Sequence, residues 1–185
     1  MFNENWYNSG QCEDLMGLVR NIKDLSGSIV EIGCWEGNST SNIANASYPE
    51  IVICNDTWMG SPEDLTVTRL AKERDVYSQF LINMNTFTKG NYSVEKKDCF
   101  EFLKNFNEPI KFIHIDAMHD YKNVFNTIQI VLPKMVKGGI LCGDDFNNAH
   151  INREDLQGGV ERAVREALPG FKNLSGGNLW YYVVE

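Results

Sequence analysis

Short apolar runs alternate along this chain with longer stretches in which apolar residues recur at helical spacing. Four of the runs, residues 28–33, 50–55, 111–115 and 138–143, have the length of a buried strand. Helix-length segments separate them, which is how parallel strands are connected. The pattern therefore predicts an α/β fold, a Rossmann-like doubly wound sheet that is mostly parallel and has helices on both faces.

The remaining segments complete this alternation. Residues 92–96 predict a strand at the sheet edge. Residues 171–174 and 179–184 predict a closing hairpin across a Ser-Gly-Gly-Asn turn, which makes the last strand antiparallel. Apolar spacing and helix start signals predict helices over 15–25, from 39 onward, and over 76–87, 98–106, 124–133 and 160–168.

A chain of 185 residues can bury a full core and predicts one domain, 1–185. We expect residues 1–27 to form an N-terminal helical cap, and residues 61–89 to form an insert that acts as a lid. The oligomeric state is left open, and a partner subunit in a homo-oligomer is another way to complete a pocket.

Charge and composition narrow the choice of partner. The chain carries 17 Lys and Arg residues against 25 Asp and Glu, a formal net charge of −8, and has no long basic run. Nucleic-acid binders need a basic face that meets the phosphates. We therefore expect a small-molecule substrate and no nucleic-acid partner.

The sequence also indicates a compartment. Its five cysteines are scattered without a C-x-x-C pair, and the first residues lack the charged and apolar regions of a signal peptide. No apolar run approaches the length of a membrane span. We expect a cytoplasmic protein that does not enter the membrane.

The two apolar runs in the second half both end in acid. Asp116 follows the first, with His119 three residues on, and Asp144 and Asp145 follow the second. Neighbouring parallel strands place their carboxyl ends side by side, so these residues should converge, and crowded carboxylates must bind protons or share a cation. In the alternative reading, Asp144 or Asp145 caps the next segment and His119 bonds the backbone of its own loop.

The loop after the first strand reads Val-Glu-Ile-Gly-Cys-Trp-Glu-Gly over residues 30–37. Gly33 allows a tight turn, and Gly37 lets the backbone approach a ligand closely. The spacing differs from the G-x-G-x-x-G of NAD-binding proteins and from a P-loop. Asp56 closes the next strand, where a carboxylate can accept hydrogen bonds from ribose hydroxyls. Together with Glu31, these residues favour a nucleoside-like cofactor, and a plain turn is the alternative.

This loop resembles motif I of class I S-adenosylmethionine (SAM)-dependent methyltransferases, and residues 55–58, Asn-Asp-Thr-Trp, are similar to the acidic end of their second strand. Residues 115–121, 132–146 and 159–168 resemble the branch that contains the macrocin-type sugar O-methyltransferases. The resemblance covers residues 28–185 and implies a seven-stranded sheet whose last strand is antiparallel.

The resemblance also implies where SAM lies: over the glycines of the first loop, with its ribose on Asp56 and its adenine near Asp98 and Cys99. Asp98 is equally a natural N-cap for the following helix, and both roles are compatible. The implied cofactor-binding residues are Glu31, Gly33, Cys34, Gly37, Asp56, Thr57, Asp98, Cys99 and Asp116.

A hydroxyl that attacks a methylsulfonium must lose its proton. His119, whose ordinary pKa is near neutral, is the expected catalytic base, with Asp116 beside it. Catechol-type methyltransferases resemble this layout but usually have Lys at the base position, so His119 matches the sugar-modifying branch better. Asp116, Asp144 and Asp145 are the expected metal ligands, because their oxygens suit a hard cation such as Mg²⁺. His150 is the alternative base.

We therefore expect a SAM-dependent O-methyltransferase that acts on a hydroxyl of a small molecule, a sugar or glycosylated metabolite. Trp6, Tyr7, Trp58 and Met59 are candidates for the substrate rim. Two alternatives remain. One is a non-catalytic SAM-binding module, and the other is a nicotinamide-dependent oxidoreductase on a similar fold, against which the missing G-x-G-x-x-G argues.

Overall fold

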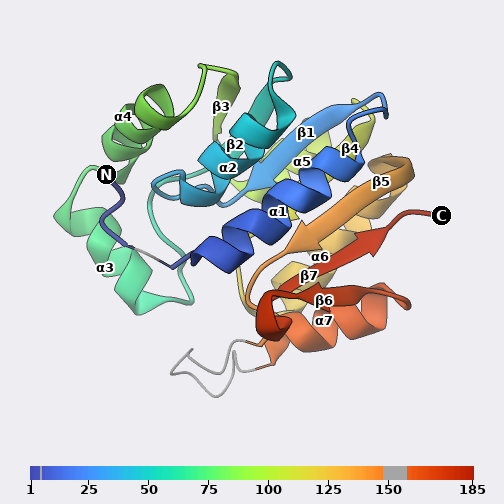
Figure 1. Ribbon diagram of the computed structural model, residues 1–185. Coiled ribbons are helices and arrows are strands. Elements are labelled where there is room, and N and C mark those ends of the chain that lie inside the picture. The colour runs from blue at the N-terminus through green and yellow to red at the C-terminus, as the bar shows by residue number, and fades with distance from the viewer. Residues whose placement is uncertain (5, 148–157) are drawn as a thin grey trace.

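The computed structural model describes residues 1–4, 6–147 and 158–185. Its centre is a seven-stranded sheet in the order β3-β2-β1-β4-β5-β7-β6 (Figure 1). The first five strands of the chain run parallel, and β7 is antiparallel to both β5 and β6, which confirms the predicted sheet. The strands are β1 (Ser28–Ile32), β2 (Val52–Asp56), β3 (Tyr92–Lys96), β4 (Ile110–Ile115), β5 (Met135–Gly143), β6 (Lys172–Leu174) and β7 (Leu179–Val183).

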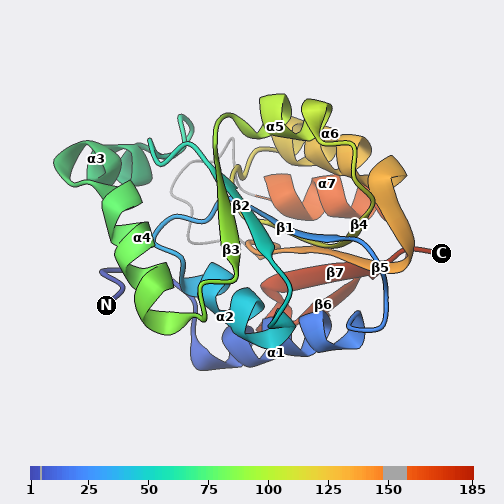
Figure 2. The ribbon, with the colours of Figure 1, turned by 90° about the horizontal axis from the view of Figure 1, so that it is seen from above.

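Helices cover both faces of the sheet (Figure 2). α1, α2 and α4 pack on one face and α5, α6 and α7 on the other, each group around its own buried apolar cluster. The helices are α1 (Ser9–Asn21), α2 (Asn38–Ser47), α3 (Leu65–Glu73), α4 (Val76–Phe87), α5 (Cys99–Asn105), α6 (Tyr121–Val131) and α7 (Gly159–Ala167), with short 3₁₀ turns at Leu132–Lys134 (η1) and Ser175–Gly177 (η2).

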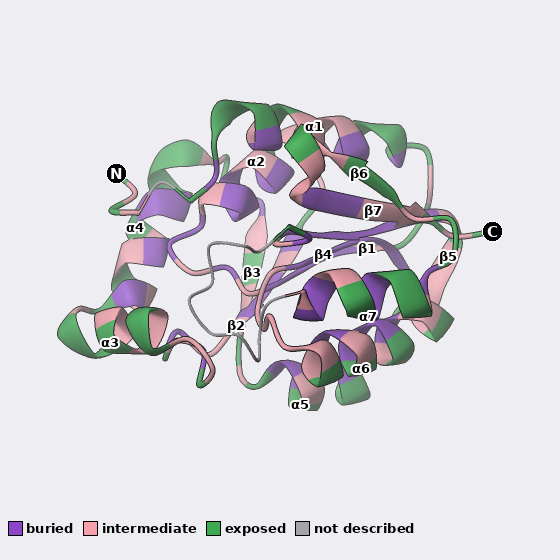
Figure 3. Ribbon diagram, turned by 90° about the horizontal axis from the view of Figure 1, so that it is seen from below, coloured by how far each residue is buried: buried purple, intermediate pink, exposed green. Residues whose placement is uncertain are grey.

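β4 shows why the apolar runs form strands. All of its residues are buried, and the central strands lie between two helical layers (Figure 3). A strand covered on both faces lacks the polar alternation of a half-exposed strand. Successive side chains still point to opposite faces, so Phe112 packs in the cluster under α1 and Ile113 in the cluster under α6.

The strand register decides which side chains meet at the carboxyl edge. Glu31 of β1 pairs with His114 of β4, and His114 pairs with Cys142 of β5. Side chains two residues further along point to the same face of a sheet. Asp116 and Asp144 therefore follow at the edge, on the face that α1 covers.

α1 begins at Ser9 rather than at the predicted Leu15. The side chain of Asn8 accepts a hydrogen bond from the N–H of Gln11, and the side chain of Gln11 accepts one from the N–H of Asn8. This capping box starts the helix in a polar turn that apolar spacing could not reveal.

The insert at residues 61–89 holds α3 and α4. α4 buries Phe80 and Met84 in the core, whereas α3 has no buried residue. Among the helices that the structure describes, none combines the length and apolarity that crossing a membrane requires.

Candidate active site

A cavity of about 840 Å³ opens at the carboxyl edge of the parallel strands. The loops that follow β1, β2, β4 and β5 line it, together with the N-terminal segment and the residues before α3. Open α/β sheets bind ligands at this edge, and cofactor sites have volumes of this order.

Glycines shape the loop after β1. Gly33 has φ 85°, and a Cβ at this position would stand 2.1 Å from the carbonyl oxygen of Asp116. Gly37, with φ 87°, precedes α2, whose first turn has no side-chain cap. The N–H groups of such a helix terminus are available to a polar or anionic part of a ligand.

Asp56 ties the loops after β1 and β2 together. Its Oδ2 accepts hydrogen bonds from the N–H groups of Cys34 and Trp35, each at 2.8 Å, and its Oδ1 accepts one from Trp58 at 2.7 Å. Burial raises the pKa of this carboxyl, and the backbone donors offset part of that rise. Asp56, which is predicted to bind ribose, thus also orders the loop after β1, called the cofactor loop below. Its Oδ1 keeps a further acceptor position.

Cys34, Thr57, Asp98 and Cys99 also line the cavity. Asp98 accepts hydrogen bonds from backbone N–H groups of the first turn of α5 at 2.9 and 3.1 Å, so its N-cap role is confirmed. Burial and the charge of Asp98 raise the pKa of Cys99 to about 12, which keeps its thiol neutral. The contact of both residues with adenine stays a prediction.

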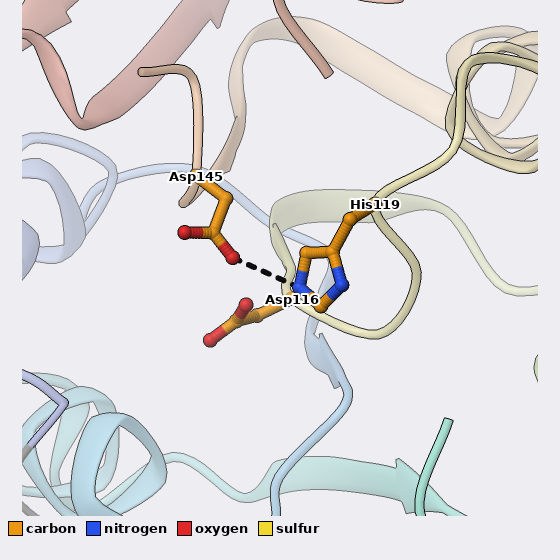
Figure 4. A group of neighbouring side chains, drawn as sticks. All are labelled: Asp116, His119 and Asp145. Atoms are coloured by element: carbon orange, nitrogen blue, oxygen red, sulfur yellow. Dashed lines mark ion pairs between the residues drawn. The ribbon is translucent and has the colours of Figure 1, made fainter. Parts of the chain in front are cut away.

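Asp116, His119 and Asp145 face one another at the cavity (Figure 4). One potential ligand atom of each lies within 4.8 Å of the others. Nε2 of His119 lies 2.8 Å from Oδ2 of Asp145. Asp145 has φ 58°, a left-handed conformation that is uncommon outside glycine and often found at functional sites.

Asp116, Asp144 and Asp145 form an acidic cluster in which like charges lie close together. Burial and the charges of Asp144 and Asp145 raise the pKa of Asp116 to about 8. Burial and the charge of Asp145 raise the pKa of Asp144 to about 6. Burial alone would lower the pKa of His119, but the hydrogen bond and charge of Asp145 raise it to about 9. Without a cation, the cluster therefore holds protons at neutral pH.

Asp144 turns toward α1 and β7. Both of its carboxylate oxygens lie 3.2 Å from Nε2 of Gln11, and Oδ1 accepts a hydrogen bond from Nδ2 of Asn178 at 2.6 Å. Of the three predicted metal ligands, Asp116 and Asp145 thus belong to the group in Figure 4, in which His119 is the third member. Asp144 also lines the cavity, and amide donors that hold a carboxylate are common around metal ligands.

Glu31 points into the core and does not line the cavity, and its role in cofactor binding stays a prediction. Its Oε1 lies 3.0 Å from Nδ1 of His114, and both side chains are fully buried. Nε2 of His114 lies 2.8 Å from the hydroxyl of Tyr7. Glu31 belongs to β1 itself, before the turn at Gly33, so its side chain projects from the sheet face and not from the loop.

Sequence reasoning missed three residues that support the cluster. Gln11 and Asn178 hold Asp144, and Oε1 of Glu63 accepts a hydrogen bond from the N–H of His119 at 3.3 Å. The Asn-x-x-Gln spacing at the start of α1 marks Gln11 only as a capping residue. Asn178 and Glu63 carry no local signal, because their partners are distant in the sequence.

Only two of the four residues predicted for the substrate rim lie at the cavity. Trp6 and Tyr7 line the cavity. Trp58 is only 4% exposed and packs against rings of α4, so it is a core residue, whereas Met59 is 75% exposed. His150, the alternative base, lies outside the described residues.

A family profile described as a methyltransferase domain matches residues 30–146, which hold the cofactor loop, Asp56 and the acidic cluster. The chain belongs to the methyltransferase domain family. It is a class I SAM-dependent methyltransferase with the Rossmann-like sheet of that class. Among curated proteins, this methyltransferase has no match.

Solved structures share the fold of this methyltransferase at low sequence identity. The O-methyltransferase NovP aligns with a TM-score of 0.66 and 14% identity over 94% of this chain and 79% of its own. The calicheamicin methyltransferase CalS11 aligns with 0.63 and 18% over the same shares. TomG from Streptomyces achromogenes, an O-methyltransferase solved with SAM, aligns with 0.65 and 15% over 95% and 80%.

Proposed function

We propose that this methyltransferase transfers the methyl group of SAM to a hydroxyl of a small molecule, a sugar or glycosylated metabolite, with a divalent cation and His119 assisting. One observation carries the proposal: the cofactor loop and the acidic cluster with its histidine face the same cavity. A methyl donor on the first would therefore meet an activated oxygen on the second.

The lining of the cavity fits SAM. Gly33 lets the loop after β1 lie against the backbone of Asp116, and the uncapped first turn of α2 offers N–H groups to a polar ligand. Asp56 retains an acceptor position for ribose, and the neutral thiol of Cys99 offers an apolar contact to a flat base. Bound SAM supplies a methyl group on a positively charged sulfur.

The acidic cluster fits a hard divalent cation. The raised pKa values of Asp116 and Asp144 reflect burial together with mutual repulsion that such a cation relieves. With Asp145 they offer an all-oxygen donor set, and Gln11 and Asn178 would orient Asp144 in it. A bound Mg²⁺ would lower the pKa of a substrate hydroxyl.

We assign the proton transfer to His119. Asp145 holds Nε2 of its ring, and Glu63 holds its backbone N–H, so the imidazole has a defined orientation. A pKa of about 9 keeps the ring protonated at neutral pH. A cation that binds Asp116 and Asp145 would neutralise their charges and draw Oδ2 of Asp145 away from Nε2. The pKa of the ring would then fall toward its ordinary value, and the freed, neutral Nε2 could accept the proton of the attacking hydroxyl.

The choice of a hydroxylated acceptor rests on two further points. Residues 115–121 and 132–146, at the ends of β4 and β5, resemble the macrocin-type sugar O-methyltransferases. The similar structure CalS11 is described as a TDP-rhamnose 3′-O-methyltransferase. Polar side chains at the acidic end of the cavity, among them Ser61, Glu63 and Asn178, can hydrogen-bond the hydroxyls of a sugar.

The test is a release assay for S-adenosylhomocysteine (SAH) with TDP-rhamnose and catechol as acceptors, run with Mg²⁺ and with EDTA. We expect SAH formation that depends on both acceptor and cation. Undiminished turnover in EDTA would remove the cation from the proposal. If SAM binds in calorimetry but no hydroxylated acceptor is methylated, the chain is a SAM-binding module. Binding of NAD in place of SAM would favour an oxidoreductase.

A further inference from the structure

A chain of polar side chains crosses the apolar core beneath the cavity. Oε1 of Glu31 lies 3.0 Å from Nδ1 of His114, and Nε2 of His114 lies 2.8 Å from the hydroxyl of Tyr7. Glu31 and His114 are fully buried, and Tyr7 is 6% exposed. Burying such groups among apolar residues costs free energy even when they are bonded to one another. The proposed transfer mechanism uses none of the three.

This polar chain ends at the cavity, near Asp116 and Asp144. Glu31 and His114 are paired across β1 and β4, and both strands reach the cofactor loop and Asp116 two residues later on the same face. Tyr7 itself lines the cavity. Burial, followed by the charges of Asp144 and Asp116, raises the pKa of Tyr7 well above its usual range, so its hydroxyl stays neutral beside these carboxylates.

The phenol oxygen of Tyr7 keeps an acceptor position whichever form His114 takes. Ionised Glu31 can only accept, so Nδ1 of His114 carries a proton. If Nε2 carries none, it accepts the proton of Tyr7 and leaves both phenolic lone pairs. If Nε2 carries one, it donates to the phenol oxygen, and one lone pair remains.

We propose that Tyr7, oriented by His114 and Glu31, contacts the sulfonium end of bound SAM through its phenol oxygen and makes the cavity prefer SAM over SAH. The two ligands differ only in one methyl group and its positive charge. An oxygen lone pair attracts both the positive sulfur and the polarised C–H bonds of that methyl group. The preference also favours release of SAH after transfer, and it is independent of which acceptor is used.

The test compares the Kd of SAM with that of SAH by isothermal titration calorimetry. For Tyr7→Phe we expect the affinity for SAM to fall ~3- to 10-fold relative to that for SAH, the loss that one hydrogen bond represents. The matched control is Tyr92→Phe, which removes a hydroxyl bonded to Asn85 outside the cavity lining. This control should leave the ratio of the two Kd values unchanged.

A merely structural role of Tyr7 predicts a different result. A distorted cavity would weaken the binding of SAM and of SAH equally. An unchanged ratio of the two Kd values therefore overturns the proposal, whether or not both affinities fall. Because loss of the hydroxyl can disturb the core, Glu31→Gln provides a second variant. It keeps the size of the side chain and an acceptor for His114 but removes the negative charge, so the ratio should move in the same direction by a smaller factor.

Discussion

Gly33 lies so close to Asp116 that a Cβ on residue 33 would stand 2.1 Å from the carbonyl oxygen of Asp116. The N–H of Asp116 also donates to the carbonyl oxygen of Ile32 at 2.8 Å. The cofactor loop after β1 and the acidic loop after β4 are therefore in direct backbone contact. This contact sets the separation between the proposed donor and acceptor sides.

Gly33→Ala should damage both folding and cofactor binding. The new Cβ meets rigid backbone, and φ 85° is unfavourable for alanine. We expect the free energy of unfolding, measured in urea, to fall by ~2–4 kcal/mol, with SAM binding lost in calorimetry. Gly90→Ala is the control, because its Cβ would meet nothing within 4 Å at φ 76°, and it should cost only ~1 kcal/mol. Similar losses in both variants would contradict the close-contact argument.

Asp56→Asn should loosen the cofactor loop. The carboxylate accepts hydrogen bonds at both oxygens, so the amide must direct its NH₂ group at a backbone donor. We expect a loss of ~1–3 kcal/mol in stability and a weaker Kd for SAM. Asp75→Asn, which changes only an exposed N-cap of α4, should leave SAM binding unchanged. Wild-type affinity for SAM in Asp56→Asn would refute the anchoring role.

The protein should lose stability as pH rises when no cation is bound. Asp116 has a folded pKa of about 8 against an ordinary 3.8, and His119 one of about 9 against 6.5. At pH values between the ordinary and the raised pKa of each group, the folded state therefore binds more protons than the unfolded chain. The stability that these two groups contribute is fully present below their ordinary pKa values and is lost as pH rises through their raised pKa values. In EDTA, the thermal midpoint should fall between about pH 6 and pH 9.

Two additions sharpen that measurement. Asp116→Asn removes the largest carboxyl contribution, so the fall of the midpoint with pH should become shallower. Excess Mg²⁺ competes with protons, so the rise in midpoint that it causes should be larger at high pH than at low pH. A midpoint that is flat in EDTA for the wild-type protein would refute the crowding of the cluster.

His119→Gln separates a base from a metal ligand. If His119 accepts the proton, kcat should fall ~10²- to 10⁴-fold while the affinity for Mg²⁺ stays near that of the wild-type protein. Stopped-flow or steady-state kinetics and a Mg²⁺ titration followed by thermal shift provide the two readings. A large loss of Mg²⁺ affinity would instead make His119 a ligand of the cation, as the convergence of its ring with Asp116 and Asp145 also allows.

Gln11→Leu tests the support of Asp144. Its Nε2 is the donor that reaches both oxygens of that carboxylate from α1. Loss of such a donor around a metal ligand typically weakens the metal ~10- to 100-fold, and we expect this for Mg²⁺. The variant loses the bond from the N–H of Asn8 to the Gln11 side chain but keeps the bond from the N–H of residue 11 to Asn8, so α1 still has an N-cap. Asp24→Asn, an exposed change, is the control. Unchanged Mg²⁺ affinity would place Asp144 outside the donor set.

Much of the architecture follows from local sequence patterns. Apolar runs such as 111–115, separated by helix-length segments, are enough to predict a doubly wound sheet, because burial on both faces and parallel connection leave few other arrangements. The rule that parallel strands end at one edge also brings Asp116 and Asp145 together. Both inferences depend on periodicity and chain direction, which the sequence carries by itself.

Tertiary structure alone decided which side chains serve the cavity. Glu31, two residues before Gly33, belongs to the core because the strand ends between them. Asp144 is held by Gln11, and Tyr7 is bonded to His114, across separations of more than a hundred residues. Local patterns specify the period of an element, whereas the partner of a side chain depends on how distant elements pack. The acidic cluster was therefore visible in the sequence, and the residues that orient it were not.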